Sequence, residues 1–299
     1  MSKFIMMVGL PASSKSTIAQ QISIKENAII HASDSLRKEL FGNEDANDKN
    51  DELFKELHSR IKADLRAGKN VTYDATNINY KRRKAFLEEL KKIDCEKICC
   101  LVATPYEKCL EQNKLRERKV PEYIIKKMYL NFYIPQDYEG WDKIVIIYNT
   151  DESSYLDNSS LFQDLNIINQ DNPNHSLTIG QHCMMCSANL YKTQDYNLVA
   201  AGLYHDIGKK FTKQFKNSKG EDTEIAHYYQ HHNISAYIAL FYLMNNPYVD
   251  LLQVIKLIQW HMQPFFMKEQ KTIDKFIRMV GQEFYDKLMI LHEADKKAK

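Results

Sequence analysis

The residues best suited to chemistry near the start of the chain are Gly9–Thr17, with the sequence GLPASSKST. The run differs by one letter from the phosphate-binding pattern G-x-x-x-x-G-K-[ST], because Ser14 replaces the second glycine. Backbone N–H groups of such a loop cradle phosphates, its lysine reaches the β and γ phosphates, and the next hydroxyl holds Mg²⁺. The predicted ATP and Mg²⁺ contacts are Gly9, Ser13, Ser14, Lys15, Ser16 and Thr17.

Ser14 is the departure that decides whether this loop works. If its backbone is left-handed, a residue other than glycine costs about 1–2 kcal/mol there. That cost weakens the loop but does not prevent phosphate binding, because Ser14 keeps its backbone N–H. An apolar run precedes the loop and a helical pattern follows it, as a phosphate loop requires. The sequence therefore predicts a working site rather than a chance Lys-Ser pair at a helix start.

Other charged residues fit phosphoryl transfer. Asp34 follows the second apolar run and Asp74 ends the third, where side chains face the ligand crevice of a parallel sheet. Asp34 is also a good helix N-cap, and that reading stays open. Asp74 suits the second metal shell of a phosphate-loop enzyme. The stretch KLRERKVP, with Arg116 and Arg118, predicts either a basic loop over the transferring phosphate or a solvated face.

The elements that must position these residues alternate in type. Apolar runs that predict buried strands stand at 4–8, 27–31, 70–74, 97–103 and 143–148. Helical patterns lie between them, at 15–25, 52–68, 80–93, 106–118 and 121–133. This alternation predicts an α/β domain over residues 1–149, a parallel sheet with helices on both faces.

Residues 3–148 resemble the polynucleotide 5′-hydroxyl kinase family of P-loop phosphotransferases. The resemblance rests on GLPASSKST, the D-x-x-R of 34–37, the DATN of 74–77 with two arginines after it, and R-x-R-K-V-P. It implies that Asp34 deprotonates the 5′-hydroxyl and that Arg37 contacts the nucleic-acid acceptor. It also implies that Arg118 stabilises the transferring phosphate, with Lys15 as the second cation of the reaction.

The second half of the chain differs from the first in its residue pattern. Residues 150–174 are rich in Asn, Asp and Ser, which predicts a linker. From residue 175 to 299 the strand signal vanishes, so a nearly all-α domain is expected. Its distinctive pair is His205-Asp206. Further histidines and an acid lie on apolar helical stripes, which predicts inward-facing side chains: His182, His231, His261 and Asp295.

Several inward histidines with two acids favour a metal site over satisfied core histidines, because a buried carboxylate needs a partner. Residues 175–297 resemble the HD-domain metal-dependent phosphohydrolases, most closely those appended to tRNA nucleotidyltransferases, through GKKFTK and HEAD. The resemblance implies His182, His205, Asp206 and Asp295 as primary ligands of Mn, Fe, Co, Ni or Zn. His231 and His261 would complete a second metal or bind the substrate phosphate, and His227 and His232 compete with His231.

The net charge, the cysteines and the lengths of the apolar segments indicate how the protein binds nucleic acid and where it works. The formal net charge is only +2, so contacts to nucleic acid must come from local clusters such as Arg82, Arg83, Lys209, Lys210 and Lys213. The six cysteines show no disulfide spacing, which favours a reducing cytoplasm, and no apolar segment reaches the ~18 residues of a membrane span.

The leading hypothesis is a bifunctional enzyme that heals RNA or DNA ends. It would phosphorylate 5′-hydroxyl ends with ATP and hydrolyse 3′ or 2′,3′-cyclic phosphate ends, which prepares a break for a separate ligase. The first alternative is a nucleoside or nucleotide kinase fused to a nucleotidase. The second is an idle ATP-sensing domain that regulates the HD domain.

Overall fold

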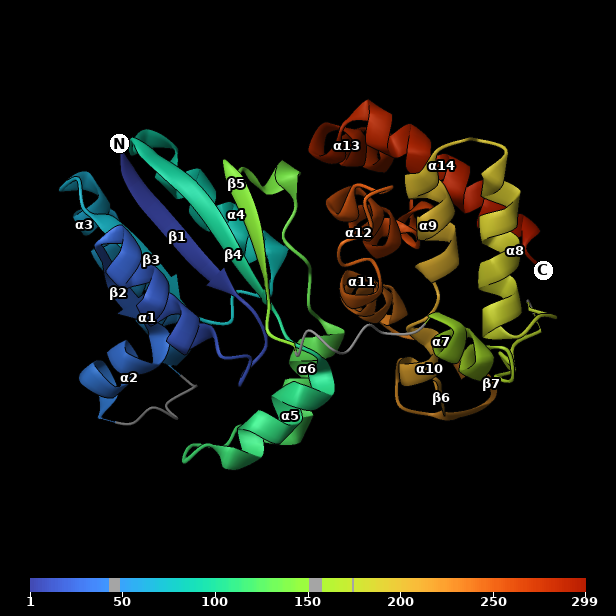
Figure 1. The fold of residues 1–299 in the computed structure, drawn as a ribbon, viewed down its shortest axis with the longest axis horizontal. Helices are drawn as coiled ribbons and strands as arrows, with labels where there is room; N and C mark the ends of the chain where they lie inside the picture. Colours follow the sequence, from blue (N-terminus) through green and yellow to red (C-terminus); the bar gives the residue numbers. More distant parts are fainter. Residues whose placement is uncertain (43–48, 151–157, 174) are drawn as a thin grey trace. The chain divides into compact units, whose positions relative to one another are not determined.

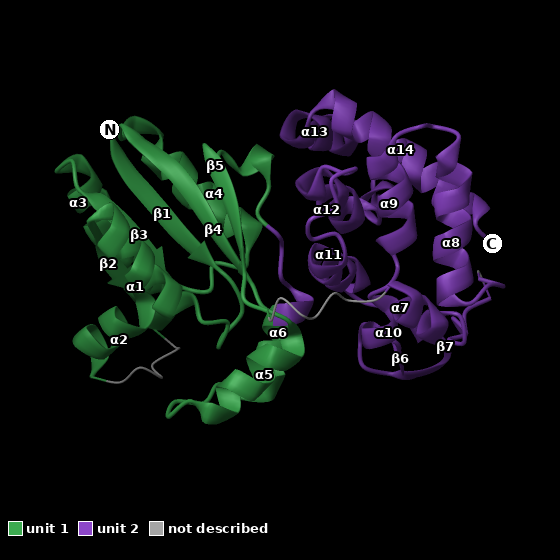
Figure 2. Ribbon diagram, viewed as in Figure 1, with its two compact units in different colours: residues 1–128, 135–151 green, residues 129–134, 152–299 purple. Residues whose placement is uncertain are grey.

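The chain forms two compact units. The computed structural model describes residues 1–42, 49–150, 158–173 and 175–299. Unit 1 comprises residues 1–128 and 135–151, and unit 2 comprises residues 129–134 and 152–299 (Figure 2). Within the described ranges, no helix combines the length and the apolar character needed to cross a membrane.

Unit 1 is built on a five-stranded parallel sheet in the order β2-β3-β1-β4-β5 (Figure 1). Each apolar run predicted to be a strand forms one of these strands, so the predicted parallel sheet is confirmed. The strands are β1 (Ser2–Val8), β2 (Ala28–Ala32), β3 (Asn70–Asp74), β4 (Cys95–Ala103) and β5 (Lys143–Tyr148).

Helices follow the strands along the chain, as the alternating pattern predicts. They are α1 (Lys15–Glu26), α2 (Ser33–Phe41), α3 (Asn50–Arg66), α4 (Tyr80–Glu89), α5 (Tyr106–Leu115) and α6 (Glu122–Leu130), with short 3-10 turns η2 (Leu90–Lys92) and η3 (Asp137–Glu139). Alternate residues of β1 pack on opposite faces of the sheet. Ile5 and Met7 join Ala19 of α1 in one apolar cluster, whereas the ring of Phe4 lies 5.5 Å from that of Phe86 on α4. Helices therefore cover both faces.

The core of unit 1 contains a histidine that is held neutral. His58 of α3 stacks on Phe86 with 3.8 Å between ring centroids, and its Nε2 lies 3.4 Å from Tyr73 Oη. Burial lowers the pKa of His58 to about 4, and the nearby Glu89 offsets this only in part. The unfolded chain therefore takes up a proton near pH 6.5 that the folded unit accepts only near pH 4.

We expect His58→Phe to flatten the acid side of the stability profile of unit 1. The wild-type free energy of unfolding should fall by about 2–3 kcal/mol, through this group, as the pH drops through that window. The variant should lack this decline, because phenylalanine binds no proton. Denaturant unfolding followed by Trp141 fluorescence, in a Trp260→Phe background, measures both slopes. Equal slopes in the two proteins would contradict the assignment.

Unit 2 is mainly helical. Its helices are α7 (Asn158–Leu165), α8 (Ile179–Tyr191), α9 (Tyr196–Tyr204), α10 (Lys209–Thr212), α11 (His231–Tyr242), α12 (Leu251–Trp260), η4 (Gln263–Phe266), α13 (Gln270–Val280) and α14 (Gln282–Lys297). Two short strands, β6 (Gln214–Lys216) and β7 (Asp222–His227), form an antiparallel hairpin. The hairpin departs from the nearly all-α domain that the sequence predicts for this half of the chain.

The predicted linker at 150–174 is wrong where α7 lies. Leu161 and Leu165 are four residues apart and both are buried, so they give residues 158–165 an apolar face to pack. Residues 151–157 and 174 of that predicted linker lie outside the described residues.

Unit 2 also includes residues 129–134, which the sequence assigns to the first domain. Phe132 is fully buried, and its ring centroid lies 5.1 Å from that of Tyr237 on α11. The side chain of Asn233 donates to the carbonyl oxygen of Leu130 at 2.9 Å. The predicted second domain at 175–299 therefore omits two segments of the compact unit, 129–134 and α7.

Candidate active sites

The loop between β1 and α1 has the conformation that its motif predicts. A Cβ at Gly9 would lie 2.9 Å from Ser13 Oγ and 3.0 Å from the carbonyl oxygen of Val102, so only glycine fits without a shift. Ser14 has φ 66° and ψ 14°, the left-handed backbone for which the motif normally uses glycine.

Two side chains hold the hydroxyl of Ser14. Ser14 Oγ lies 3.3 Å from Gln112 Oε1, to which it donates, and accepts from Asn149 Nδ2 at 3.2 Å. Asn149 Nδ2 also lies 3.3 Å from the carbonyl oxygen of Ser13. These contacts offset the strain of a left-handed serine, since glycine at this position would make none of the side-chain bonds.

Lys15 is buried in this loop. Its Nζ donates to the carbonyl oxygen of Leu10 at 2.6 Å. Burial lowers the pKa of Lys15 to about 8, and the charge of Asp74 opposes that shift. Arg116 lowers the same pKa and Asp34 raises it, so both charged groups lie close enough to act on Lys15.

The remaining residues predicted for the nucleotide site surround this lysine. Ser13 is fully buried, and Asp74 is buried at the end of β3. Ser16 and Thr17 are exposed in the first turn of α1, where N–H groups have no partner within the helix.

The three residues predicted to handle the acceptor and the transferred phosphate come together. Arg37 Nη1 lies 3.0 Å from Asp34 Oδ1, and Arg118 Nη1 lies 3.1 Å from Asp34 Oδ2. The Asp34 side chain is 52% exposed despite these two ion pairs, so a solvent-borne hydroxyl can reach it. Arg37 is buried and is also held by Asn50 Oδ1 at 2.9 Å. A half-exposed carboxylate between two cations suits a hydroxyl acceptor and an anionic donor.

Arg83 is a correction to the sequence analysis, which proposes it for phosphate-backbone contacts. It is 1% exposed and makes a two-pronged ion pair with Glu139, with Nη2–Oε1 at 2.6 Å and Nε–Oε2 at 2.7 Å. Trp141 Nε1 donates to the same carboxylate at 3.1 Å. Arg83 therefore has a structural role, while its neighbour Arg82 is exposed.

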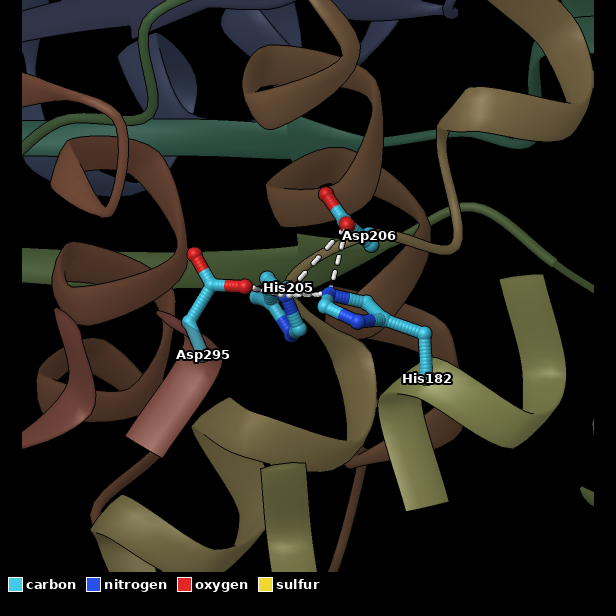
Figure 3. Close-up of side chains that lie close together, drawn as sticks. All are labelled: His182, His205, Asp206 and Asp295. Atoms are coloured by element: carbon cyan, nitrogen blue, oxygen red, sulfur yellow. Dashed lines mark hydrogen bonds and ion pairs between the residues drawn. The ribbon is translucent and has the colours of Figure 1, made fainter. Parts of the chain in front are cut away.

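In unit 2, four of the predicted ligands converge from distant parts of the chain (Figure 3). His182 comes from α8, His205 and Asp206 from the turn after α9, and Asp295 from α14. His182 Nε2 lies 3.0 Å from Asp295 Oδ1, 3.2 Å from Asp206 Oδ2 and 3.2 Å from His205 Nε2. Two imidazoles and two carboxylates around one point form the ligand set of a divalent metal.

A second group shares Asp206. His231 Nε2 lies 3.1 Å from Asp206 Oδ1 and 3.1 Å from His261 Nε2. The structure thus places His231, rather than His227 or His232, beside His261 and Asp206. The two oxygens of one carboxylate face the two groups, the arrangement of a bridging ligand between two metal ions.

The tautomers of the four histidines fit metal ligation. Each Nδ1 faces a backbone carbonyl oxygen at 2.5 to 2.8 Å, which obliges Nδ1 to carry the hydrogen. In the neutral ring, each Nε2 then points its lone pair at the shared centre. The two Nε2 atoms within each group lie 3.1–3.2 Å apart. Lone pairs that face each other at this distance repel unless a cation lies between them. This observation shows that the residues present fit a metal ion. The partners are Ala298, Gly202, Tyr228 and Ile258, for His182, His205, His231 and His261 in turn.

Neighbouring charges and burial shift the pKa values of these residues. Burial lowers the pKa of His182, but Asp206 and Asp295 outweigh burial and raise it overall. Burial would raise the pKa of Asp206, yet Lys209 and His205 hold it well below its usual range. His261 lies farther from the acids, and burial lowers its pKa to about 4.

Lys209 is a residue of this site that sequence reasoning misplaced. It is buried, and its Nζ lies 2.7 Å from Asp206 Oδ2 and donates to Gln170 Oε1 at 2.7 Å, so it is no surface contact. The signal that could have found it is its spacing, one helical turn after Asp206. Gly208, the residue before Lys209, allows close packing in the same region. A Cβ there would lie 2.3 Å from the carbonyl oxygen of His231, so glycine lets α11 approach the His205-Asp206 turn.

We expect Asp295→Asn to weaken the first metal group selectively. The acid is 12% exposed on its side chain and lies near the C-terminus of the chain. Its amide keeps the shape but loses the anion that faces His182, so affinity for Mn²⁺ should fall more than about 100-fold, since outer partners alone cost 10–100-fold. Metal analysis after dialysis measures this, with the exposed Asp286→Asn of the same helix as control. Wild-type metal content would contradict the assignment.

Comparisons with known proteins match a different family model in each half of the chain. Residues 4–135 match the family model of the AAA domain, and residues 174–298 match that of the HD domain. A curated relative, L-seryl-tRNA(Sec) kinase of Methanococcus maripaludis, is 28% identical over 178 residues. The aligned part covers 56% of this chain and 66% of the relative, just under two thirds of its length.

Two solved structures show weaker likeness. The Pnkp1/Rnl/Hen1 RNA repair complex matches with a TM-score of 0.37 and 20% identity, over 44% of this chain and 43% of that one. A gluconokinase from Sinorhizobium meliloti matches with a TM-score of 0.37 and 15% identity, over 50% and 83%. Taken with the sheet order and the two residue groups, the family matches show that the chain carries an N-terminal P-loop kinase-like AAA domain followed by a C-terminal HD domain.

Proposed function

We propose that this protein heals broken RNA ends, with a polynucleotide 5′-hydroxyl kinase in unit 1 and a metal-dependent 3′-end phosphohydrolase in unit 2. The observation that carries the kinase proposal is the Asp34 carboxylate held between Arg37 and Arg118. Phosphoryl transfer to a hydroxyl needs a base close to that hydroxyl and cations close to the phosphates of donor and acceptor. This group offers both within one cluster.

In the kinase reaction, Lys15 leaves the carbonyl of Leu10 and contacts the β and γ phosphates of ATP, while loop N–H groups hold the phosphate oxygens. Ser16 and Asp74 would hold Mg²⁺ directly and through water. Asp34 accepts the proton of the 5′-hydroxyl as that oxygen bonds to the γ-phosphorus, while the bond from the γ-phosphorus to the β–γ bridging oxygen breaks and ADP leaves. Arg118 moves from Asp34 to the transferring phosphoryl group, and Arg37 stays with the acceptor strand. Phosphoryl transfer needs mainly this positioning and charge stabilisation.

In the hydrolase reaction, His182, His205, Asp206 and Asp295 would hold one divalent ion, and Asp206, His231 and His261 a second. Such ions activate water and polarise the phosphoryl group. Lys209 fixes the Asp206 carboxylate at 2.7 Å and neutralises part of the charge in the pocket. The Nδ1–H bonds to backbone carbonyls keep each imidazole oriented while substrate enters and leaves.

The two activities complement each other chemically. Many ribonucleases leave a 5′-hydroxyl and a 2′,3′-cyclic phosphate, and these are the ends that the two units would process. The product would carry a 5′-phosphate and a free 3′ end, the substrate of a separate ligase.

The test is an RNA oligomer with a 5′-hydroxyl and a 2′,3′-cyclic phosphate, incubated with ATP, Mg²⁺ and Mn²⁺, with both ends analysed. We expect both to change. Asp34→Asn should lose 5′ phosphorylation and keep 3′ hydrolysis, and the exposed Asp51→Asn should keep both. A 5′ end left unphosphorylated by the wild-type protein would overturn the kinase proposal.

A second acceptor is favoured by one comparison. The relative named L-seryl-tRNA(Sec) kinase aligns over 56% of this chain, so the hydroxyl of a seryl group carried on tRNA is a candidate acceptor. Oligomers, seryl-tRNA and free nucleosides should be compared as acceptors. Preference for nucleosides would support the nucleotide-kinase alternative, and ATP binding without transfer to any acceptor would support the idle sensor.

A further inference from the structure

Two neighbouring residues of α5 connect the phosphate loop to the basic loop at 116–120. Gln112 contacts the hydroxyl of Ser14, as described above, and lies near the C-terminus of α5. Asn113 is the next residue, and it points to a different partner. Two adjacent residues of α5 thus contact two separate parts of the kinase site, the phosphate loop and the basic loop.

Asn113 closes the base of the basic loop. It is 3% exposed, its Nδ2 donates to the carbonyl oxygen of Val120 at 2.8 Å, and its Oδ1 accepts from the N–H of Val120 at 2.9 Å. One side chain therefore satisfies both backbone groups of a residue seven positions later. The loop between them, with Arg116 and Arg118, is fixed at its two ends by α5 and by Asn113.

Two arginines of that loop interact with charged residues of the kinase site. Arg118 pairs with Asp34, and Arg116 is close enough to lower the pKa of Lys15. The position of the loop therefore sets whether Arg118 pairs with Asp34.

The other end of the connection depends on Ser14 not being glycine. The hydroxyl is the only side-chain group that the second motif position offers, and its partners are Gln112 and Asn149. Thr104 Oγ1 donates to the carbonyl oxygen of Ser13 at 3.1 Å, so this part of the loop is also tied to the end of β4. A change in the conformation of the loop at Ser14 would therefore alter its contact with Gln112.

We propose that Ser14, Gln112 and Asn113 form a relay that sets the position of the Arg116–Arg118 loop according to the nucleotide in the phosphate loop. The relay rests on the proposed kinase function. Phosphates draw Lys15 and the N–H groups of the loop toward them, which shifts the Ser14 hydroxyl. Gln112 passes the shift to α5, and Asn113 passes it to Val120. Arg118 then leaves Asp34 for the phosphate. Gln112 and Asn113 are positioning residues, and neither touches the reacting atoms.

The test uses trypsin, because the loop contains Arg116, Arg118 and Lys119. Cleavage after these residues is followed by mass spectrometry on the full chain, with and without a non-hydrolysable ATP analogue and Mg²⁺. In the wild-type protein we expect the analogue to change the cleavage rate by about fivefold or more, the size of a typical coupling between sites. Gln112→Ala should bind the analogue with nearly unchanged affinity by calorimetry while its cleavage rate no longer responds.

Two further variants separate the relay from general destabilisation. Asn113→Asp keeps the bond from the Val120 N–H and loses the bond to its carbonyl, so cleavage should be fast in both states. Glu111→Ala changes an exposed neighbour on the same helix and should respond like the wild type.

A full analogue response in Gln112→Ala would overturn the relay, as would loss of response in Glu111→Ala alone. Neither readout needs an acceptor. If oligonucleotides are not phosphorylated and the pattern of protection is as expected, the proposed acceptor fails and the relay holds.

Discussion

Asp206→Asn should abolish metal binding and 3′-end hydrolysis together. Asp206 is 2% exposed and is the one residue common to both groups of ligands. The amide removes the charge that faces four histidines, so each group is left with fewer anionic ligands. We expect Mn²⁺ content to fall to background and hydrolysis to fall at least about 10³-fold, comparable to the loss of a central electrostatic group. Metal analysis and product assays on one preparation measure both.

The same substitution should lower stability even without metal. Lys209 lies buried against Asp206, and an amide leaves its charge without an anion. We expect a loss of about 3–5 kcal/mol in the free energy of unfolding of unit 2. Asp164→Asn is the matched control, because Asp164 pairs with the next lysine, Lys210, at 2.7 Å with a side chain that is 58% exposed. That pair should contribute at most about 1 kcal/mol. Metal content unchanged in Asp206→Asn would rule out the shared site.

Lys15→Ala should stop phosphoryl transfer and leave 3′-end hydrolysis intact. Lys15 is the buried cation of the phosphate loop, and no other lysine lies in Gly9–Thr17. Removal of one such charge should lower turnover at least about 10³-fold. Transfer of the γ-phosphate from labelled ATP to a 5′-hydroxyl oligomer measures the loss.

The control for this variant is Lys25→Ala, an exposed lysine in the last turn of the same helix. It should keep both activities. Retained transfer in Lys15→Ala would refute the assignment of the phosphate loop. Loss of 3′-end hydrolysis in the same folded variant would instead show that the two activities depend on one another.

The sheet of unit 1 was predictable because its signal is local. Short runs rich in apolar residues predict strands, and β3 and β5 have the predicted bounds. The convergence of the predicted ligands was predictable for a related reason. A ligand on an amphipathic helix shares the phase of the apolar stripe, as Asp295 does with Leu288 and Leu291.

What sequence reasoning missed depends on partners far along the chain. Arg83 looks like a surface cation until Glu139, 56 residues later, is seen to bury it. Lys209 looks like one of a basic run until Gln170, 39 residues earlier, is found at its ammonium group. Ser14 looks like a defect of the motif until Gln112 and Asn149 are found at its hydroxyl. Pattern and spacing along one helix carry no information about such pairings.

The placement of residues 129–134 in unit 2 has a consequence for synthesis on the ribosome. Phe132 and Ile134 are fully buried, but α11 and α12 follow them by about a hundred residues. At translation rates of about 5–20 residues per second, these side chains wait on the order of 10 s for their partners. The sheet of unit 1 is complete by Tyr148, well before then. A nascent chain at this stage carries all five strands of unit 1 together with a short apolar segment whose partners have not yet been synthesised.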